Sequence, residues 1–302
     1  MTNILLSTIK KVIGTGPTRF IAPFYHGLRG LAVSVVNSNP SGKLQVIGVT
    51  GTKGKTSTTV IIGRILNLAG IKTGYISTST LCEDGNRGHE YLNPYKMTSI
   101  DPAIMHRKIA KMVQNGCRYL VIELSSEGLF QNRHWGLGGI DIGVFLNLYP
   151  EHIESHGGLH NYMKAKAKLF SHLKQGGTFI GNSDNGKGQN EDQLVKTEFM
   201  YNAIPDKIKP FIKKILIASK NDFRVLSDPN SLFKTLELDG NSIPTNFIAS
   251  FEITNLVFAL NVLAAVDKKS YQELISTGKG KLLEIHGLPG RMEWVVLNGK
   301  VV

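Results

Sequence analysis

The sequence has few cysteines, no long hydrophobic run and no tract in which arginines alternate with aromatic residues. Its two cysteines, Cys82 and Cys117, do not form a CxxC pair, so neither disulfide stapling nor a structural zinc site is expected. This cysteine usage is typical of a reducing cytosol, and we expect a cytoplasmic location. The lack of arginine–aromatic clusters argues against a nucleic-acid partner.

The N-terminal region lacks the features of a signal peptide. Its first apolar stretch, ILLSTIKKVI, contains lysines, and no small-residue cleavage site follows it. Residues 20–36 are apolar and aromatic, but Pro23, His26 and Arg29 interrupt them, so a membrane span is not expected. A helix lying on the main domain is the favoured interpretation. Contact of residues 1–36 with a membrane surface is the less favoured alternative.

Length and charge set broad limits on the protein. A chain of 302 residues with 41% apolar residues can form one large domain or two smaller ones, each with a buried core. The formal net charge is +12. Such a charge is typical either of a lysine-rich solvated surface or of a protein with polyanionic ligands.

Short apolar strands alternate with helical segments from residue 43 onwards. The predicted strands are 44–50, 72–78, 118–124, 140–148 and 177–182. The predicted helices are 56–69, 101–114, about 159–173, and 251–265. This alternation predicts an α/β protein with a doubly wound, mostly parallel sheet. Residues 223–248 resemble a small antiparallel β section.

The segment GTKGKT, residues 51–56, follows a predicted strand and opens a predicted helix. Its glycines let backbone amides turn towards a phosphate, and the start of the helix adds its dipole. Lys55 can neutralise phosphate charge, and Thr56 can offer its hydroxyl to Mg²⁺. The strict G-x-x-x-x-G-K-[ST] pattern is not met, because Val49 occupies the position of the first glycine. We nevertheless expect a nucleoside triphosphate here.

Two more residues have the chemistry of such a site. Glu123 ends a predicted strand, where it can hold Mg²⁺ against a nucleotide or act as an ordinary salt-bridge partner. Lys166 lies between Tyr162 and Phe170, at i−4 and i+4, on the apolar side of a predicted helix. Two interpretations are open for this lysine. Either it takes part in the chemistry, or its aliphatic chain packs at the edge of the core while its amine reaches solvent.

Five motifs follow one another in a region that begins at about residue 43, and the last of them ends at residue 293: GTxGKT, E-x-S-S, N-L…H, Y-x-x-A-K-x-x-L-F and P-G-R-M-E. In this order they resemble the Mur ligase family, in particular its UDP-N-acetylmuramoyl-tripeptide synthetase branch. The resemblance implies an ATP-dependent ligase of peptidoglycan precursor synthesis. Such an enzyme adds an amino acid to a UDP-N-acetylmuramoyl peptide through an acyl phosphate, with ATP and two Mg²⁺ ions, and we expect a monomer.

The resemblance also implies roles for individual residues. The residues implied in ATP binding are Gly51, Thr52, Lys53, Gly54, Lys55, Thr56, Ser57, Asn255 and Arg291. Those implied in catalysis are Lys55, Glu123, His152 and Lys166. The implied metal ligands are Thr56, Glu123, His152 and, once carbamylated by CO₂, Lys166. Those implied in substrate binding are Thr98, Ser99, Ser125, Gln131 and Arg133.

The chain departs from the family pattern in several places. Glu127 replaces a histidine after the paired serines, and Glu252 replaces the first asparagine of F-N-x-x-N near the adenine. We expect a helical lead-in over 1–42, the central ATP-binding domain over 43–285, and the start of a C-terminal ligase domain over 286–302. The family's N-terminal substrate domain and most of its C-terminal domain are missing, which suggests a fragment.

Two other functions remain open at this point. Folylpolyglutamate synthases have the same fold and a similar phosphate loop, although they lack the S-S…Q-x-R residues found here. A non-catalytic nucleotide-binding partner protein, which would use the basic surface and the lead-in to dock, is the second alternative.

Overall fold

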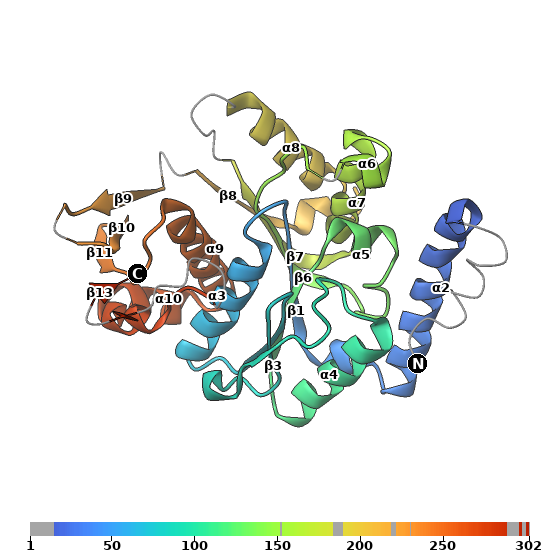
Figure 1. Cartoon of the computed structure of the whole chain (residues 1–302), viewed down its shortest axis with the longest axis horizontal. Coiled ribbons are helices and arrows are strands. Elements are labelled where there is room, and N and C mark those ends of the chain that lie inside the picture. Colours follow the sequence, from blue (N-terminus) through green and yellow to red (C-terminus); the bar gives the residue numbers. More distant parts are fainter. Residues whose placement is uncertain are drawn as a thin grey trace.

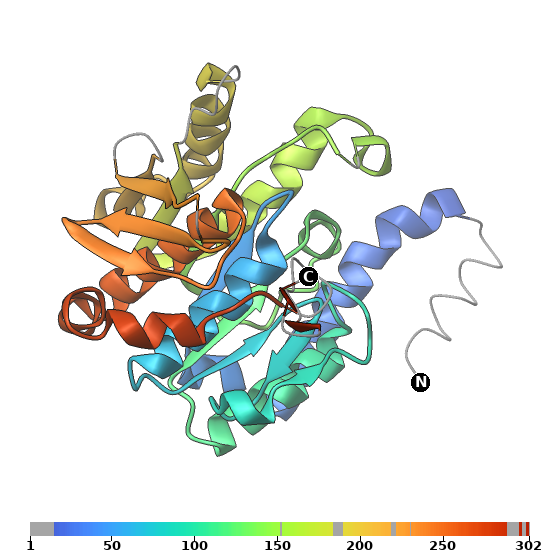
Figure 2. The same cartoon turned by 60° about the vertical axis from the view of Figure 1, so that its left-hand side comes forward.

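The computed structural model describes residues 15–151, 153–183, 190–218, 222–229, 231–288, 296–297 and 300–301. An eight-stranded sheet occupies the centre of the molecule, and helices lie on both of its faces (Figure 1). A smaller β section and two helices pack at one side, as the turned view in Figure 2 shows.

The central sheet has the order β4-β3-β2-β5-β1-β6-β7-β8. Its strands are β1 Gln45–Thr50, β2 Thr73–Ile76, β3 Thr80–Cys82, β4 Tyr91–Leu92, β5 Tyr119–Glu123, β6 Ile140–Phe145, β7 Leu173–Asn182 and β8 Lys213–Ile217. All neighbours are parallel except β3 and β4, which add an antiparallel edge beside β2. The predicted doubly wound, mostly parallel sheet is confirmed.

Strand β1 lies between β5 and β6, so the chain winds away from it in both directions. Val49 of β1 is in register with Glu123 of β5 and with Val144 of β6. In open α/β sheets ligands bind beyond the carboxyl ends of the strands at such a switch point. The segments that follow β1, β5 and β6 therefore define where a site is expected.

The helices form two layers on either side of the sheet. They are α2 Thr15–Val36, η1 Pro40–Lys43, α3 Lys55–Leu68, η2 Arg87–His89, α4 Pro102–Gln114, α5 Ser126–Phe130, α6 Ile153–His156, α7 Leu159–Ser171, α8 Asn190–Asn202, η3 Lys209–Phe211, α9 Ser250–Val266, α10 Lys268–Ser276 and η4 Lys279–Glu284. Ile47 and Val49 point into the core shared with α3 and α9. Val46 points into the opposite core, shared with α4 and α7.

The small β section consists of three antiparallel strands, β9 Phe223–Ser227, β10 Lys234–Leu238 and β11 Asn241–Pro244. The turn between β10 and β11 is Asp239–Gly240, and both residues have positive φ, as a tight hairpin requires. Two further short strands, β12 Val296–Leu297 and β13 Lys300–Val301, pair with each other. The antiparallel section predicted over 223–248 is confirmed.

Helix α2 lies at the periphery and packs against α4 and the loop after α5 (Figure 1). A Cβ on Gly27 would lie 2.6 Å from the Trp135 ring, and one on Gly30 would lie 2.6 Å from the Trp135 carbonyl oxygen. Ser34 Oγ donates to the Gly136 carbonyl over 2.8 Å. The predicted lead-in helix thus rests closely on the main domain. No helix within the described ranges is both long enough and apolar enough to cross a bilayer.

Candidate active site

The loop after β1 has the backbone geometry of an anion-binding turn. It occupies residues 51–54 and leads directly into α3, which begins at Lys55. Gly54 has a φ of 81°, and a Cβ there would lie 2.9 Å from Asn255 Oδ1. The N-cap residue of α3 provides no side-chain cap, so the helix dipole and first-turn amides, near Ser57, face the loop. This arrangement suits a phosphate group.

Asn147, which follows β6, holds this loop in place. Its Oδ1 accepts hydrogen bonds from the amides of Thr52 at 3.1 Å and Lys53 at 2.9 Å. Its Nδ2 donates to the Lys53 carbonyl at 3.2 Å. The sequence analysis did not identify Asn147 as a site residue. Its signals in the sequence were its place as the first residue of the N-L…H motif and its position just beyond the strand that neighbours β1.

The two loop lysines point in different directions. Lys55 Nζ donates to the Thr52 carbonyl over 2.9 Å, which keeps its charge beside the loop. Lys53 forms an exposed ion pair with Glu151 at 2.9 Å, and its Nζ lies over the Tyr149 ring. In this conformation Lys55 is therefore the loop lysine placed to meet a phosphate.

Glu123 and Thr56 meet at the end of β5. The Glu123 side chain is 2% exposed, and its Oε1 accepts a hydrogen bond from Thr56 Oγ1 at 3.1 Å. Its Oε2 accepts from the Thr78 amide at 2.7 Å and from Thr78 Oγ1 at 2.9 Å. Thr78, two residues after β2, was not predicted. A carboxylate and a hydroxyl so close to the phosphate loop are the oxygen donors that Mg²⁺ prefers.

Lys166 lies on the inward face of α7 and is 1% exposed. Its Nζ donates to the Gly51 carbonyl over 2.7 Å and lies 4.6 Å from the centre of the Tyr162 ring. Burial, with a further contribution from the charge of Lys55, lowers the pKa of Lys166 well below its ordinary value, although Glu123 opposes this shift. The amine is thereby biased towards its neutral, nucleophilic form.

Tyr162 connects the Lys166 helix to the phosphate loop. Its hydroxyl lies 3.0 Å from Thr52 Oγ1, and that oxygen also accepts a hydrogen bond from the Tyr149 amide. Tyr162 is 1% exposed, so this link is rigidly packed. In the sequence, Tyr162 opens the Y-x-x-A-K-x-x-L-F motif and marks the apolar side of the helix, but neither feature predicts its contact with the loop.

The five residues expected to bind substrate form one connected network. Thr98 Oγ1 lies 2.9 Å from Thr78 Oγ1, and the Thr78 hydroxyl also contacts Glu123. Ser99 Oγ and Ser125 Oγ are 2.9 Å apart. Arg133 donates to the Ser99 carbonyl over 2.7 Å and to Gln131 Oε1 over 2.8 Å. The network therefore extends the site from the phosphate loop towards α5.

Glu127 and Gly128 fix the geometry of this network. Gln131 Nε2 donates to Glu127 Oε1, so the residue that replaces the family's histidine orients a predicted substrate ligand. A Cβ on Gly128 would lie 1.9 Å from Ser99 Oγ, so only glycine fits there. Burial lowers the pKa of Arg133, and the charges of Asp101 and Glu127 oppose that shift.

Asn255 and Glu252 lie on α9, behind the phosphate loop. Asn255 Oδ1 accepts a hydrogen bond from Thr58 Oγ1 at 3.1 Å, and it lies against Gly54. Glu252 Oε2 accepts from the amides of Ile248 and Ala249, at 3.2 and 3.1 Å, and so caps the start of α9. The substitution at position 252 therefore has a structural role. His152 and Arg291 lie outside the described residues.

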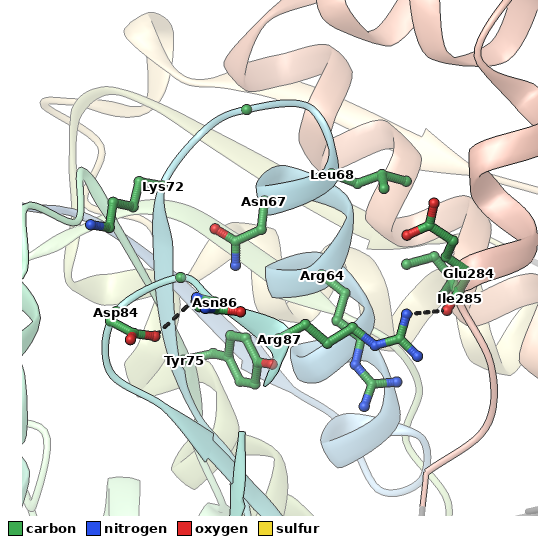
Figure 3. Close-up of a pocket in the computed structure, with 12 residues that line it drawn as sticks. Arg64, Asn67, Leu68, Lys72, Tyr75, Asp84, Asn86, Arg87, Glu284 and Ile285 are labelled. Carbon is green, nitrogen blue, oxygen red and sulfur yellow. Dashed lines mark hydrogen bonds between the residues drawn. The ribbon is translucent and has the colours of Figure 1, made fainter. Parts of the chain in front are cut away.

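A pocket of about 560 Å³ lies at the other end of α3 (Figure 3). Arg64, which lines it, follows Lys55 by nine residues, or roughly 14 Å along the helix. Arg64 forms a 2.6 Å ion pair with Glu90, and Arg87 donates to the Glu284 carbonyl. Burial raises the pKa of Glu90, but Arg64 outweighs it, so the net pKa is lowered. These contacts join residues 87–90 to α3 on one side and to the end of η4 on the other, and the phosphate loop does not line the pocket.

Comparison with known proteins gives the family. The model of the Mur ligase middle domain matches residues 49–263. A UDP-N-acetylmuramoyl-L-alanyl-D-glutamate–2,6-diaminopimelate ligase of Bacteroides fragilis is 31% identical over 268 residues, which are 87% of this chain and 50% of that protein. The chain thus spans about half the length of the curated relatives it matches.

Solved structures agree on the fold. A structure of a UDP-N-acetylmuramoyl-L-alanyl-D-glutamate–2,6-diaminopimelate ligase has a TM-score of 0.63 and 22% identity, and covers 85% of this chain and 50% of its own. Mycobacterium tuberculosis folylpolyglutamate synthase, complexed with ADP and AMPPCP, has a TM-score of 0.62 and 15% identity. The match covers 88% of this chain and 64% of the synthase chain. At these identities the likeness shows the fold alone. The family model and the 31% identical relative together show that this chain belongs to the Mur ligase family.

Proposed function

We propose that this chain carries the phosphoryl-transfer part of a ligase that uses ATP to join an amino acid to a UDP-N-acetylmuramoyl peptide. The observation that carries the proposal is the convergence of three side chains on the phosphate loop. Lys55 contacts the Thr52 carbonyl, Lys166 contacts the Gly51 carbonyl, and Glu123 contacts the first turn of α3. Phosphoryl transfer depends mainly on such positioning and on electrostatic stabilisation.

The reaction proceeds in two steps. An oxygen of the acceptor carboxylate attacks the γ-phosphorus of ATP, the bond to the bridging β–γ oxygen breaks, and ADP leaves. The amino-acid nitrogen then attacks the carbonyl carbon of the acyl phosphate, phosphate leaves, and the nitrogen loses a proton. Lys55 and the loop amides stabilise the negative charge on the phosphoryl oxygens in the first step.

The donor atoms at the loop suit Mg²⁺. Thr56 Oγ1 and Glu123 Oε1 are oxygen ligands 3.1 Å apart, and we assign them to one of two Mg²⁺ sites. When bound, Mg²⁺ would neutralise charge on the phosphate oxygens. We assign the second site to His152 and to the carbamylated form of Lys166.

Carbamylation of Lys166 is chemically consistent with its environment. Its amine is buried and biased towards the neutral form, as carbamate formation requires. The Nζ lone pair bonds to the carbon of CO₂, and the nitrogen loses a proton, which gives a carbamate. The neutral amine thereby becomes an anionic oxygen ligand.

A muramoyl peptide is favoured over a folate as the acceptor. The relatives at about 30% identity are named for UDP-N-acetylmuramoyl substrates, whereas the likeness to folylpolyglutamate synthase is one of fold. The network of Ser99, Ser125 and Arg133 lies beside Glu123, where an acceptor carboxylate has to be presented. Phosphate release measured with both acceptors and the full-length gene product will distinguish them. Release with neither acceptor would favour a non-catalytic nucleotide-binding role.

The nucleotide site is tested first on this chain alone. Lys55→Ala is expected to weaken binding of an ATP analogue at least about tenfold, because it removes the loop's phosphate-facing charge. Lys164→Ala is the matched control, since Lys164 lies on the exposed side of α7. Calorimetric titration with Mg²⁺ present measures both, and equal binding by the two variants would contradict the assignment.

A further inference from the structure

Helix α2 is docked on one side and apolar on the other. Gly27, Gly30 and Ser34 contact the loop at Trp135 and Gly136. The side that faces away carries a row of exposed apolar residues, here named the α2 stripe. Its members, with their exposed fractions, are Ile21 41%, Phe24 64%, Leu28 51%, Leu31 42%, Val35 66% and Val36 83%.

The spacing makes the α2 stripe continuous. From residue 21 to residue 35 the steps are three, four, three and four, so the side chains share one helical face. Together they extend over roughly 22 Å of helix. Single exposed apolar side chains are common on protein surfaces, whereas contiguous apolar patches mark interaction sites. Figures 1 and 2 both place α2 at the edge of the molecule.

The charge around the stripe indicates what it contacts. The sequence contains no aspartate or glutamate before Glu83. Over the first 43 residues its charged side chains are all cationic, namely Lys10, Lys11, Arg19, Arg29 and Lys43. Arg29 is paired with Asp101 at 2.6 Å, and Lys43 is exposed just beyond α2. A helix with an exposed apolar face, in a segment whose charged residues are all basic, matches an anionic bilayer surface.

A second copy of the chain fits the stripe less well. Pairing two α2 helices would bring together two segments that contain basic residues and no acidic residue of their own. A single helix face about 22 Å long is also only a narrow strip of surface. Each partner in a standard stable interface buries a broader area, of roughly 800 Å². An anionic lipid surface offers acyl chains to the apolar residues and phosphates to the basic residues.

We propose that the α2 stripe docks this protein on the surface of an anionic lipid bilayer, with α2 lying parallel to the membrane plane. Apolar side chains would enter the boundary between headgroups and acyl chains, and the exposed Lys43 just beyond α2 would contact lipid phosphates. Since α2 rests directly on Trp135, two residues beyond Arg133, docking holds the predicted acceptor network next to the membrane surface. This inference does not depend on the identity of the acceptor.

The test is sedimentation of the whole chain with vesicles. Vesicles with about one-third phosphatidylglycerol are expected to bind at least about tenfold more protein than pure phosphatidylcholine vesicles, and about 0.5 M NaCl should reduce the binding. A Phe24→Glu/Leu28→Glu variant is expected to lose at least about nine-tenths of it. Phe211→Glu, at a residue that is 56% exposed on η3, is the matched control and should bind as the parent does.

Correct folding of the double variant is checked by circular dichroism and by its affinity for an ATP analogue, both of which should equal those of the parent. Failure of the parent protein to bind anionic vesicles, or equal binding by the double variant, would overturn the proposal. Light scattering provides a second readout. A dimer that the double substitution dissociates, without lipid binding by the parent, would overturn it in favour of a second copy as occupant.

Discussion

The Lys166 amine lies where its protonated form is disfavoured. It is buried beside the Gly51 carbonyl, and burial is the main cause of its lowered pKa. Lys164, on the opposite side of the same helix, is exposed. Two lysines only two residues apart therefore have different chemistry, because the helix turns one inward and the other outward.

Lys166→Ala is expected to lower ligation by the full-length gene product at least about 100-fold, because it removes the proposed carbamate. Millimolar acetate or propionate should restore part of this activity, since a short carboxylate can occupy the same space. Lys164→Ala should keep the parent rate. Phosphate release measures all three, and a full loss without rescue by carboxylates would argue for a role of the amine itself.

Gly54 combines positive φ with close contact. Gly54→Ala is expected to destabilise the fold by about 1–2 kcal/mol through its backbone alone and to weaken nucleotide binding at least about tenfold, because the new Cβ displaces Asn255. Gly70→Ala is the matched control. Gly70 has a φ of 78° but nothing within 4 Å of its Cβ position, so it should lose stability without losing affinity. Urea unfolding and analogue titration separate the two effects.

At the scale of elements, sequence patterns predicted the buried parts of the fold well. Strands β1 and β5 are continuous apolar runs next to glycine-rich or polar segments, so their bounds were predicted within one or two residues. The edge strands β3 and β4 were missed, because two or three residues carry no periodicity and their pairing depends on tertiary contacts. Strand β8 was missed since it is half-exposed at the other edge.

Glu252 shows how one residue defines an element boundary. Glu252→Ala is expected to lower the free energy of unfolding by about 0.5–2 kcal/mol, because the amides of Ile248 and Ala249 lose their acceptor. Affinity for an ATP analogue should stay near the parent value. The matched control is Glu273→Ala on α10, an exposed glutamate without this capping role. A loss of affinity with unchanged stability would instead place Glu252 in the nucleotide site.

At the scale of the whole molecule, several buried histidines link stability to pH. Burial lowers the pKa of His134 to about 3 and that of His26 to about 4, against an ordinary value of about 6.5. Below about pH 6.5 these histidines therefore bind protons in the unfolded chain but not in the folded chain. The stability that this effect contributes is present above about pH 6.5, the ordinary histidine pKa in the unfolded chain. It falls as the pH drops from there towards 4 and 3, the pKa values of His26 and His134 in the folded chain. The net charge of +12 adds repulsion in the same range.

His134→Phe is expected to reduce the slope of the unfolding free energy against pH by about 1.4 kcal/mol per pH unit between pH 6 and 4, because its unfolded chain binds one proton fewer than the unfolded parent. His160→Phe is the control, since His160 is exposed in the folded chain. Urea unfolding at a series of pH values measures the slope. Equal slopes for parent and His134→Phe would show that His134 is protonated in the folded protein.

The candidate site could be predicted from sequence only in part. Lys55, Glu123 and Lys166 lie in motifs or at element ends that carry a local signal. Asn147 and Tyr162 also lie in motifs, but a motif does not show what a residue contacts, and Thr78 lies in none. Their contacts with the loop and with Glu123 arise when segments distant in sequence meet at the carboxyl edge of the sheet. Local patterns identify the reacting groups, whereas the groups that orient them depend on topology.

The close packing of α2 against Trp135 limits which residues natural variants can have on this helix. A methyl group at position 27 would meet the Trp135 ring, so a larger residue there needs a smaller side chain at position 135. A methyl group at position 30 would meet the backbone carbonyl of residue 135, so only glycine fits there. The outward positions 24 and 28 tolerate any bulk. Among natural variants that keep this helix, we therefore expect invariance on its inner side and free exchange of size on its outer side.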